Sequence, residues 1–121
     1  MESRQSKGRQ GEEAAAAFLR EEGLFILGCN VRCALGELDL VCRDGKTIVF
    51  VEVKTRYGKG FGLPQESVSL SKQRKLTLLA KWYLQRHGLE SRPARFDVVA
   101  VDFRDHVPQI KWIPHAFDAR E

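Results

Sequence analysis

Apolar residues recur at helical spacing in two segments of the chain. Residues 6–22 contain a run of strong helix formers, with Ser6 as a capping residue and Gly23 as a natural stop. The second segment runs from about residue 69 to residue 87 and ends before Gly88. We therefore expect two helices, each with one apolar face.

Strand-like runs occupy much of the remaining chain. They are short apolar or alternating segments bounded by glycine, proline or charged residues, at 24–31, 37–43, 46–55, 96–103 and, as a short edge strand, 109–113. Asp44-Gly45, between the second and third runs, is a strong signal for a two-residue hairpin. Residues 114–121 look like a loose tail.

The order of these elements predicts the fold class. A hairpin joins the second and third strands, whereas the long helix between the third and fourth allows a parallel crossover. We therefore expect one α/β domain over residues 1–121, with its core at about 6–113. Its mixed central sheet is flanked by helices, in the order αβββαβ with a further strand if the last short segment forms one.

Composition and charge narrow the class of protein. Lys and Arg number 20 and Asp and Glu 16, and the net charge of +4 permits an anionic partner without requiring one. Three cysteines, the absence of a secretory signal and the lack of an apolar run of about 20 residues indicate a cytoplasmic protein outside the membrane. The cysteines form no C-x-x-C pair and the histidines no H-E-x-x-H, so a zinc site is not expected.

Acidic residues gather at one end of the expected hairpin. If Asp44-Gly45 forms the turn, paired residue numbers sum to 89, so Glu37 faces Glu52 and Asp39 is a diagonal neighbour of Glu52. Diagonal neighbours lie roughly 5–8 Å apart at Cβ, which suits two carboxylates that hold one cation. Three acids in this position repel one another unless a cation or protons intervene.

Two explanations of this acidic group compete. It can be the solvated end of a strand pair, where Lys54 forms a surface salt bridge worth at most about 1 kcal/mol. Alternatively, Asp39 and Glu52 bind Mg²⁺, and Lys54 orients the attacking water or stabilises the negative transition state. Glu12 then approaches from the small-residue face of the first helix. The residues by themselves leave both explanations open.

Five short motifs follow one another between residue 8 and about residue 103. They are GRQGE at 8–12, the run 30–39 that ends in GELD, FVEVKTR at 50–56, FGLP at 61–64 and RFDV at 95–98. Together they resemble the YraN-type family of small uncharacterised bacterial proteins. Asp39 followed by the Glu52-x-Lys54 pattern also resembles the D…E-x-K core of the PD-(D/E)XK nuclease superfamily, and the YraN-type family is similar to the archaeal Holliday-junction resolvases.

The resemblance implies a restriction-endonuclease-like fold with one or two Mg²⁺ ions, for which Mn²⁺ can substitute. Matched residue by residue, it assigns catalysis to Glu12, Asp39, Glu52 and Lys54. It assigns metal binding to Asp39, Glu52 and Glu12. Leu35 stands where the superfamily name has Pro, at a position that varies widely.

Basic residues near the acidic group are candidates for contact with the DNA that the resemblance implies. Arg56, Lys59, Lys72 and Lys75 could neutralise backbone phosphates or form a plain solvated face. We expect a Mg²⁺-dependent endonuclease that hydrolyses phosphodiester bonds in DNA, with branched, Holliday-junction-like DNA suggested by the resolvase resemblance. A homodimer follows, because a two-fold junction needs paired sites. Two alternatives stay open: a non-catalytic DNA-binding or interaction module that retains the fold, and an RNA or nucleotide-processing hydrolase.

Overall fold

Two α-helices and five strands make up the described part of the chain. The computed structural model describes residues 4–105 and 107–120. In chain order the elements are α1 (Arg4–Glu21), β1 (Phe25–Cys33), β2 (Gly36–Asp44), β3 (Thr47–Tyr57), the short 3₁₀ helix η1 (Pro64–Ser67), α2 (Leu70–Arg86), β4 (Ala94–Phe103) and β5 (Pro108–Phe117). This order confirms the expected mixed α/β class and adds the last strand. Within these ranges, neither helix has the length and apolar composition that crossing a membrane requires.

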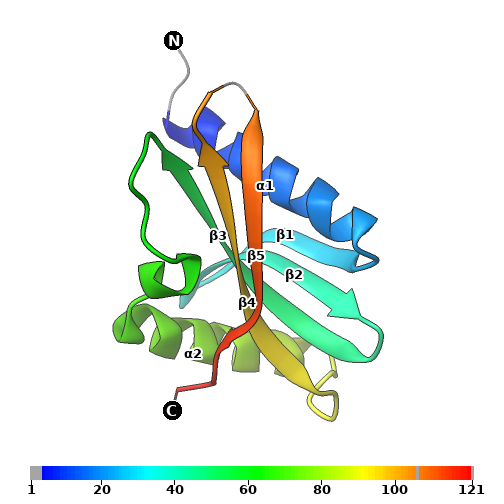
Figure 1. Ribbon diagram of the computed structural model, residues 1–121. Helices are drawn as coiled ribbons and strands as arrows, with labels where there is room; N and C mark the ends of the chain where they lie inside the picture. The colour runs from blue at the N-terminus through cyan, green and yellow to red at the C-terminus, as the bar shows by residue number, and fades with distance from the viewer. Residues whose placement is uncertain (1–3, 106, 121) are drawn as a thin grey trace.

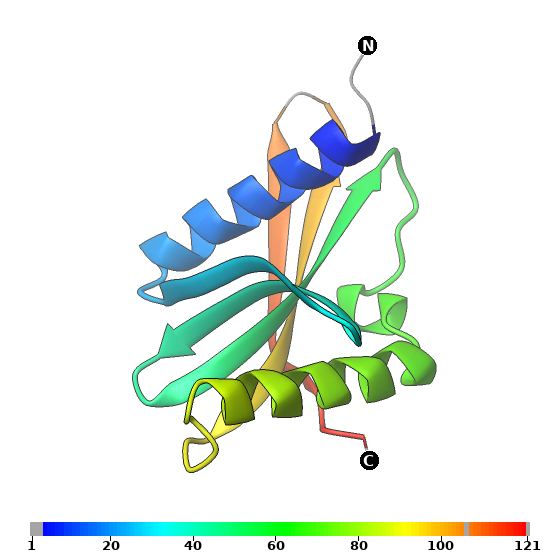
Figure 2. The same cartoon turned by 180° about the vertical axis from the view of Figure 1, so that it is seen from behind.

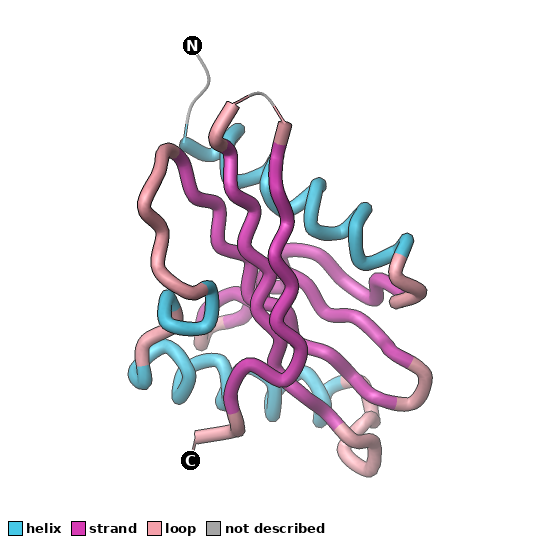
Figure 3. Tube along the Cα trace, viewed as in Figure 1, coloured by secondary structure: helices cyan, strands magenta, loops and turns pink. Residues whose placement is uncertain are grey.

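The five strands form one sheet in the order β1-β2-β3-β4-β5. β3 and β4 pair in parallel, and the other neighbouring strands are antiparallel. The parallel pair requires a long crossover, which runs through η1 and α2 and can be followed in Figure 3. Figures 1 and 2 show that the sheet is strongly twisted, with α1 and α2 on opposite sides of it.

Alternate residues of the central strand β3 face two separate cores. Val49 and Val51 pack in the core beneath α1, whereas Ile48 and Phe50 pack in the core beneath α2. Burying a side chain of this size contributes about 1.5–3 kcal/mol to folding. Because both faces of this half of β3 are covered, the polar residues that begin at Glu52 mark a change in its environment.

The hairpin between β2 and β3 has a different register from the expected one. Asp44 pairs with Thr47, so paired residue numbers sum to 91 rather than 89. Asp44 thus ends the strand, and Gly45 takes the first turn position with φ +59°, as in a type II′ turn. The expected register was wrong because the turn needs glycine, and not aspartate, at that position. Continuing the observed register sets Glu52 directly across from Asp39, not diagonal to it.

The expected loose tail over residues 114–121 is wrong for residues 114–120, which pack into the fold; Glu121 lies outside the described residues. β5 continues to Phe117, whose ring stacks on Phe96. Beyond the strand, the Arg120 backbone N–H donates to the Thr77 hydroxyl at 2.9 Å, and Arg120 Nε donates to Gln73 Oε1 at 2.8 Å. Phe117 is therefore held to β4 by its ring, and Arg120 is held to α2 by two hydrogen bonds.

Candidate functional site

β2 and β3 stop pairing at the position of Asp39. The last backbone pair before it joins Leu40 to Val51. Leu38 packs in the core beneath α2, yet Leu40, two residues later, packs in the core beneath α1. Residues two apart on a regular strand share a face, so β2 rotates about its axis at Asp39. An Asp39 oxygen, Oδ2, accepts the Val53 N–H at 2.8 Å.

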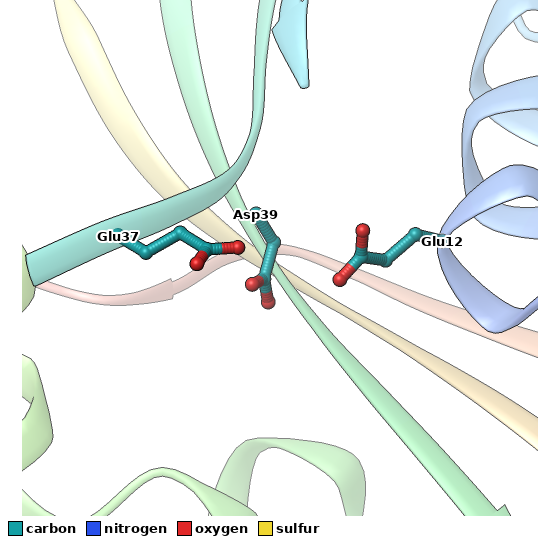
Figure 4. Close-up of side chains that lie close together, drawn as sticks. All are labelled: Glu12, Glu37 and Asp39. Carbon is teal, nitrogen blue, oxygen red and sulfur yellow. The ribbon is translucent and has the colours of Figure 1, made fainter. Parts of the chain in front are cut away.

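Three carboxylates converge beside this rotation. Glu37 and Asp39 come from β2, and Glu12 comes from α1; one ligand oxygen of each lies within 4.8 Å of those of the other two. Figure 4 shows the three side chains pointing toward one another. All three are half-buried, so the group is reached from solvent while its charges are held close together.

A close contact between α1 and β3 brings Glu12 into the group. Gly11 is buried against Thr55, and a Cβ at Gly11 would overlap the Thr55 hydroxyl and lie only 3.1 Å from the Thr55 Cβ. Only glycine allows the helix to lie this near the strand. Asn30 then fixes the carboxylate of Glu12 with a side-chain hydrogen bond. Asn30 has φ +50°, a left-handed conformation that asparagine tolerates better than most residues.

The group is electrostatically costly without a counter-charge. Burial raises the pKa of Glu12, and the charges of Asp39 and Glu37 raise it further, against the hydrogen bond from Asn30 and the charge of Arg9. A carboxylate whose pKa is raised by burial and by neighbouring carboxylates, as that of Glu12 is, binds a proton or a cation more readily than an isolated one.

Glu52 lies next to Asp39 but deeper in the protein. The residue is 7% exposed, and burial, followed by the hydrogen bond and charge of Asp39, raises the pKa of Glu52 to about 8. Lys72 and Lys54 oppose this shift. Lys72 Nζ lies 3.6 Å from Glu52 Oε2, and within the described ranges that oxygen accepts no hydrogen bond.

The structure therefore brings the site residues predicted from the sequence to one place and adds Glu37 to them. Glu12 and Asp39 belong to the three-carboxylate group, Glu52 adjoins Asp39, and half-buried Lys54 follows on the same strand. Glu37 takes the third position in the group that the sequence assigned to Glu52. The catalytic and metal-binding roles of these residues stay predictions.

Two of the four expected DNA-binding residues border the acidic group. Lys72 reaches Glu52, and Lys75 packs over Gly36, where an added Cβ would lie 2.9 Å from Lys75 Cε. Lys59 is exposed on the glycine-rich loop after β3.

The fourth, Arg56, is held inside the protein. Its Nε and Nη2 donate to the two oxygens of Asp102 at 2.7 and 2.9 Å, and its Nη1 donates to the Gly62 carbonyl at 2.8 Å. The guanidinium also lies 4.6 Å from the centroid of the Phe61 ring. Hydrogen bonding to Arg56 holds the pKa of Asp102 below its usual range. Arg56 thus fastens the glycine-rich loop to β4, and its expected contact with DNA stays a prediction.

An open hollow of about 400 Å³ leads to the carboxylates. Its lining joins acidic and basic residues: Gly8, Arg9, Glu12, Asn30, Arg32 and Glu37. Arg32 Nε donates to Glu37 Oε2 at 2.8 Å. The sequence placed Lys72 near these acids, but it did not single out Asn30 or Arg32 as their neighbours. Only Arg32 carried a usable signal, because it precedes Glu37 across a short turn between two strands.

Comparison with known proteins identifies relatives over nearly the whole chain. The model of the Uncharacterised protein family UPF0102 matches residues 11–101. The UPF0102 protein of Pseudomonas aeruginosa strain PAO1 is 49% identical over 121 aligned positions, which cover 98% of this chain and 97% of its own. The UPF0102 protein of Syntrophotalea carbinolica is 46% identical over 115 residues, covering 95% and 94%, and that of Moorella thermoacetica 48% over 117, covering 95% and 98%. A family model that spans the site, and relatives of matching length, show that the chain belongs to the UPF0102 family.

Proposed function

We propose that this protein is a Mg²⁺-dependent endonuclease that hydrolyses phosphodiester bonds in DNA. The observation that carries the proposal is the convergence of the Glu12, Glu37 and Asp39 carboxylates within 4.8 Å beside an open hollow. Glu52 and Lys54 follow on the adjoining strand, in the E-x-K spacing of the PD-(D/E)XK nuclease superfamily.

The donor set fits a hard divalent cation. Mg²⁺ prefers carboxylate oxygens and keeps several water ligands, so a partly exposed group of acids suits it better than a closed protein cage. Glu12, Glu37 and Asp39 would hold the ion, with Glu52 as the further ligand that the superfamily resemblance assigns. Mn²⁺ takes the same oxygen ligands and serves as a probe. When bound, such an ion activates a water and neutralises charge that develops on the phosphate.

The protein's own residues supply orientation and charge. Asp39 is fixed by the Val53 N–H, and Glu12 by Asn30, so the carboxylates are preorganised by their neighbours. Lys54, two residues after Glu52 on β3, provides a positive charge that stabilises the negative charge developing on the phosphodiester. Glu12, Glu37 and Asp39 would thus hold the cation, and Lys54 would supply a positive charge for phosphodiester hydrolysis.

The proposal also includes branched DNA as the substrate and a homodimer as the active assembly. Similarity to the resolvases supports branched DNA as the substrate, and cutting a two-fold junction requires a homodimer with paired sites. Lys72 and Lys75 border the acidic group and would contact backbone phosphates. The free thiols of Cys29, Cys33 and Cys42 support a reducing, cytoplasmic setting.

A cleavage assay tests the proposal. Wild-type protein, Asp39→Asn and the control Glu13→Gln, which alters an exposed acid one residue after Glu12, are incubated with labelled four-way junction and linear duplex DNA in Mg²⁺ or EDTA. The proposal predicts Mg²⁺-dependent cutting by wild type and Glu13→Gln, and loss of about a hundredfold or more in Asp39→Asn. Binding without cutting by all three proteins would favour the non-catalytic DNA-binding module. A parallel reaction contains labelled RNA, and cutting of that RNA but of neither DNA would favour the RNA hydrolase.

A further inference from the structure

One carboxylate of the acidic group is already engaged by an arginine. Arg32 on β1 pairs directly with Glu37 on β2 in the sheet register, and its Nε donates to Glu37 Oε2 at 2.8 Å. The Arg32 side chain is 77% exposed, whereas that of Glu37 is 32% exposed. The guanidinium therefore lies at the mouth of the site, bonded to it through one edge.

Arg32 lies where a substrate phosphate would meet the site. It lines the same hollow as Glu12 and Glu37, and Arg9 is the other basic residue in that lining. Guanidinium groups bind phosphate oxygens through paired N–H donors, which is the geometry for which arginine is preferred over lysine. An exposed arginine beside carboxylates that hold a cation can therefore contact the same phosphodiester as the cation.

Glu37 cannot bind Arg32 and a divalent cation at full strength at the same time. A divalent cation on the Glu37 carboxylate withdraws the charge that holds Arg32, and it repels the guanidinium directly. The ion pair itself is exposed and screened by solvent, so little opposes the exchange.

We propose that Arg32 is a phosphate-binding residue of this site, held by Glu37 in the cation-free protein and released to the phosphodiester when a divalent cation takes the Glu37 carboxylate. The proposal rests on the proposed nuclease function for its cation. The arginine and its partner can nevertheless be tested without any cation. The consequence is that DNA binding and cation binding are coupled through one side chain.

The first experiment measures DNA binding in EDTA by fluorescence anisotropy of a labelled duplex. Arg32→Gln is introduced into the wild type, into Glu37→Gln and into Glu12→Gln. Glu12→Gln removes the same negative charge from the same group without freeing Arg32. Arg32→Gln should weaken binding about tenfold in the Glu37→Gln background, and by about twofold or less in the other two. An equal loss of DNA affinity on Arg32→Gln in all three backgrounds, or no loss in any of them, would overturn the proposal.

The second experiment adds the cation. With millimolar Ca²⁺, which binds the same kind of oxygen ligands, the cost of Arg32→Gln in the wild type should rise to the tenfold seen in Glu37→Gln. A gel confirms that the DNA stays intact. Arg20→Gln, on an exposed arginine of α1 outside the hollow, serves as the matched control and should cost no more than about twofold with or without Ca²⁺. If Ca²⁺ leaves the cost of Arg32→Gln unchanged, release by the cation is refuted.

Different results would refute the nuclease site and the phosphate-binding role of Arg32. Calorimetric titration with Mn²⁺ reports cation binding by the wild type independently of DNA. No Mn²⁺ binding together with a background-dependent cost of Arg32→Gln in EDTA would refute the nuclease site, and with it the release step, while leaving Arg32 as a phosphate contact. Mn²⁺ binding together with a uniform cost of Arg32→Gln would refute the role of Arg32 alone.

Discussion

The carboxylate of Asp39 accepts the backbone N–H of Val53 at 2.8 Å. Regular pairing between β2 and β3 ends just before these residues, at Leu40 and Val51. A side-chain oxygen thus replaces the backbone carbonyl that a continued ladder would supply, and the two strands separate without leaving a buried N–H unpaired. The same residue therefore stabilises the branch point of the sheet and contributes to the acidic group.

This double role predicts different effects for two substitutions at Asp39. Asp39→Ala should lower the free energy of unfolding by about 1–3 kcal/mol, because it leaves the Val53 N–H without its acceptor. Asp39→Asn keeps an oxygen acceptor and should cost less than the alanine variant. Urea unfolding in EDTA measures both. Equal stability of the two variants would mean that the hydrogen bond contributes nothing.

Two glycines of α1 offer a matched pair. Gly11→Ala should destabilise the protein by about 1–3 kcal/mol, because the added methyl overlaps Thr55 and pushes α1 away from β3. Gly8→Ala, whose Cβ would meet no atom within 4 Å, should instead stabilise by up to about 1 kcal/mol through helix propensity. Thermal unfolding compares them, and Thr55→Ala should partly restore Gly11→Ala. Similar melting temperatures for the two glycine variants would contradict the close approach.

Glu52 should make the metal-free protein less stable as the pH rises. Its folded pKa is raised to about 8 from an ordinary value of 4.5, first by burial and then by Asp39. Between these values the folded state keeps a proton that the unfolded state releases, so stability present below pH 4.5 is lost as the pH rises through 8. Unfolding in EDTA should show this decline, at most about 1.4 kcal/mol per pH unit for one proton.

Glu52→Gln provides the check on that decline. The amide carries no charge, so the variant should lose the slope and be more stable than wild type near pH 8. Glu13→Gln, on an exposed acid, should keep the wild-type slope. A slope unchanged in Glu52→Gln would assign the pH dependence to another group.

The ion pair of Arg56 and Asp102 should be structural. Arg56→Ala leaves the fully buried Asp102 carboxylate with Lys111 Nζ, at 3.5 Å, as its ion-pair partner among the described residues, and should cost about 3 kcal/mol or more in unfolding free energy. Lys59→Ala, on the exposed loop nearby, should change stability by less than about 0.5 kcal/mol. Chemical denaturation gives both values. If Arg56→Ala changes stability only slightly but greatly weakens DNA binding, Arg56 contacts DNA, as expected from the sequence.

The sequence predicts the element order because hydrophobic periodicity and stop signals are local. Its error at the hairpin was also local: both possible registers bury the same faces, and only the need for glycine at the first turn position separates them. The motif RFDV shows a different limit. Asp97 in it accepts bonds from Arg95, the Trp112 indole and the His115 N–H, so part of the family pattern maintains the sheet and not the chemistry.

The acidic group could be predicted in part. Strand alternation places Asp39, Glu37 and Glu52 at one end of two neighbouring strands. The rotation of β2 at Asp39, which turns Glu37 toward Glu12 and leaves Glu52 buried, depends on packing against both helices and has no local sequence signal. The role of Asn30 depends in the same way on a long-range contact with α1.

Binding of a divalent cation by the carboxylates of Glu12, Glu37 and Asp39 underlies both the proposed nuclease activity and the proposed release of Arg32. Soaking crystals in millimolar Mn²⁺ and collecting anomalous diffraction data tests it most directly. We expect one anomalous peak ligated by Glu12, Glu37 and Asp39 in the wild type and no peak in Asp39→Asn, with Arg32 no longer bonded to Glu37 in the wild type. No peak in the wild type, with Arg32 still bonded to Glu37, would refute cation binding at these carboxylates and favour a non-catalytic DNA-binding protein.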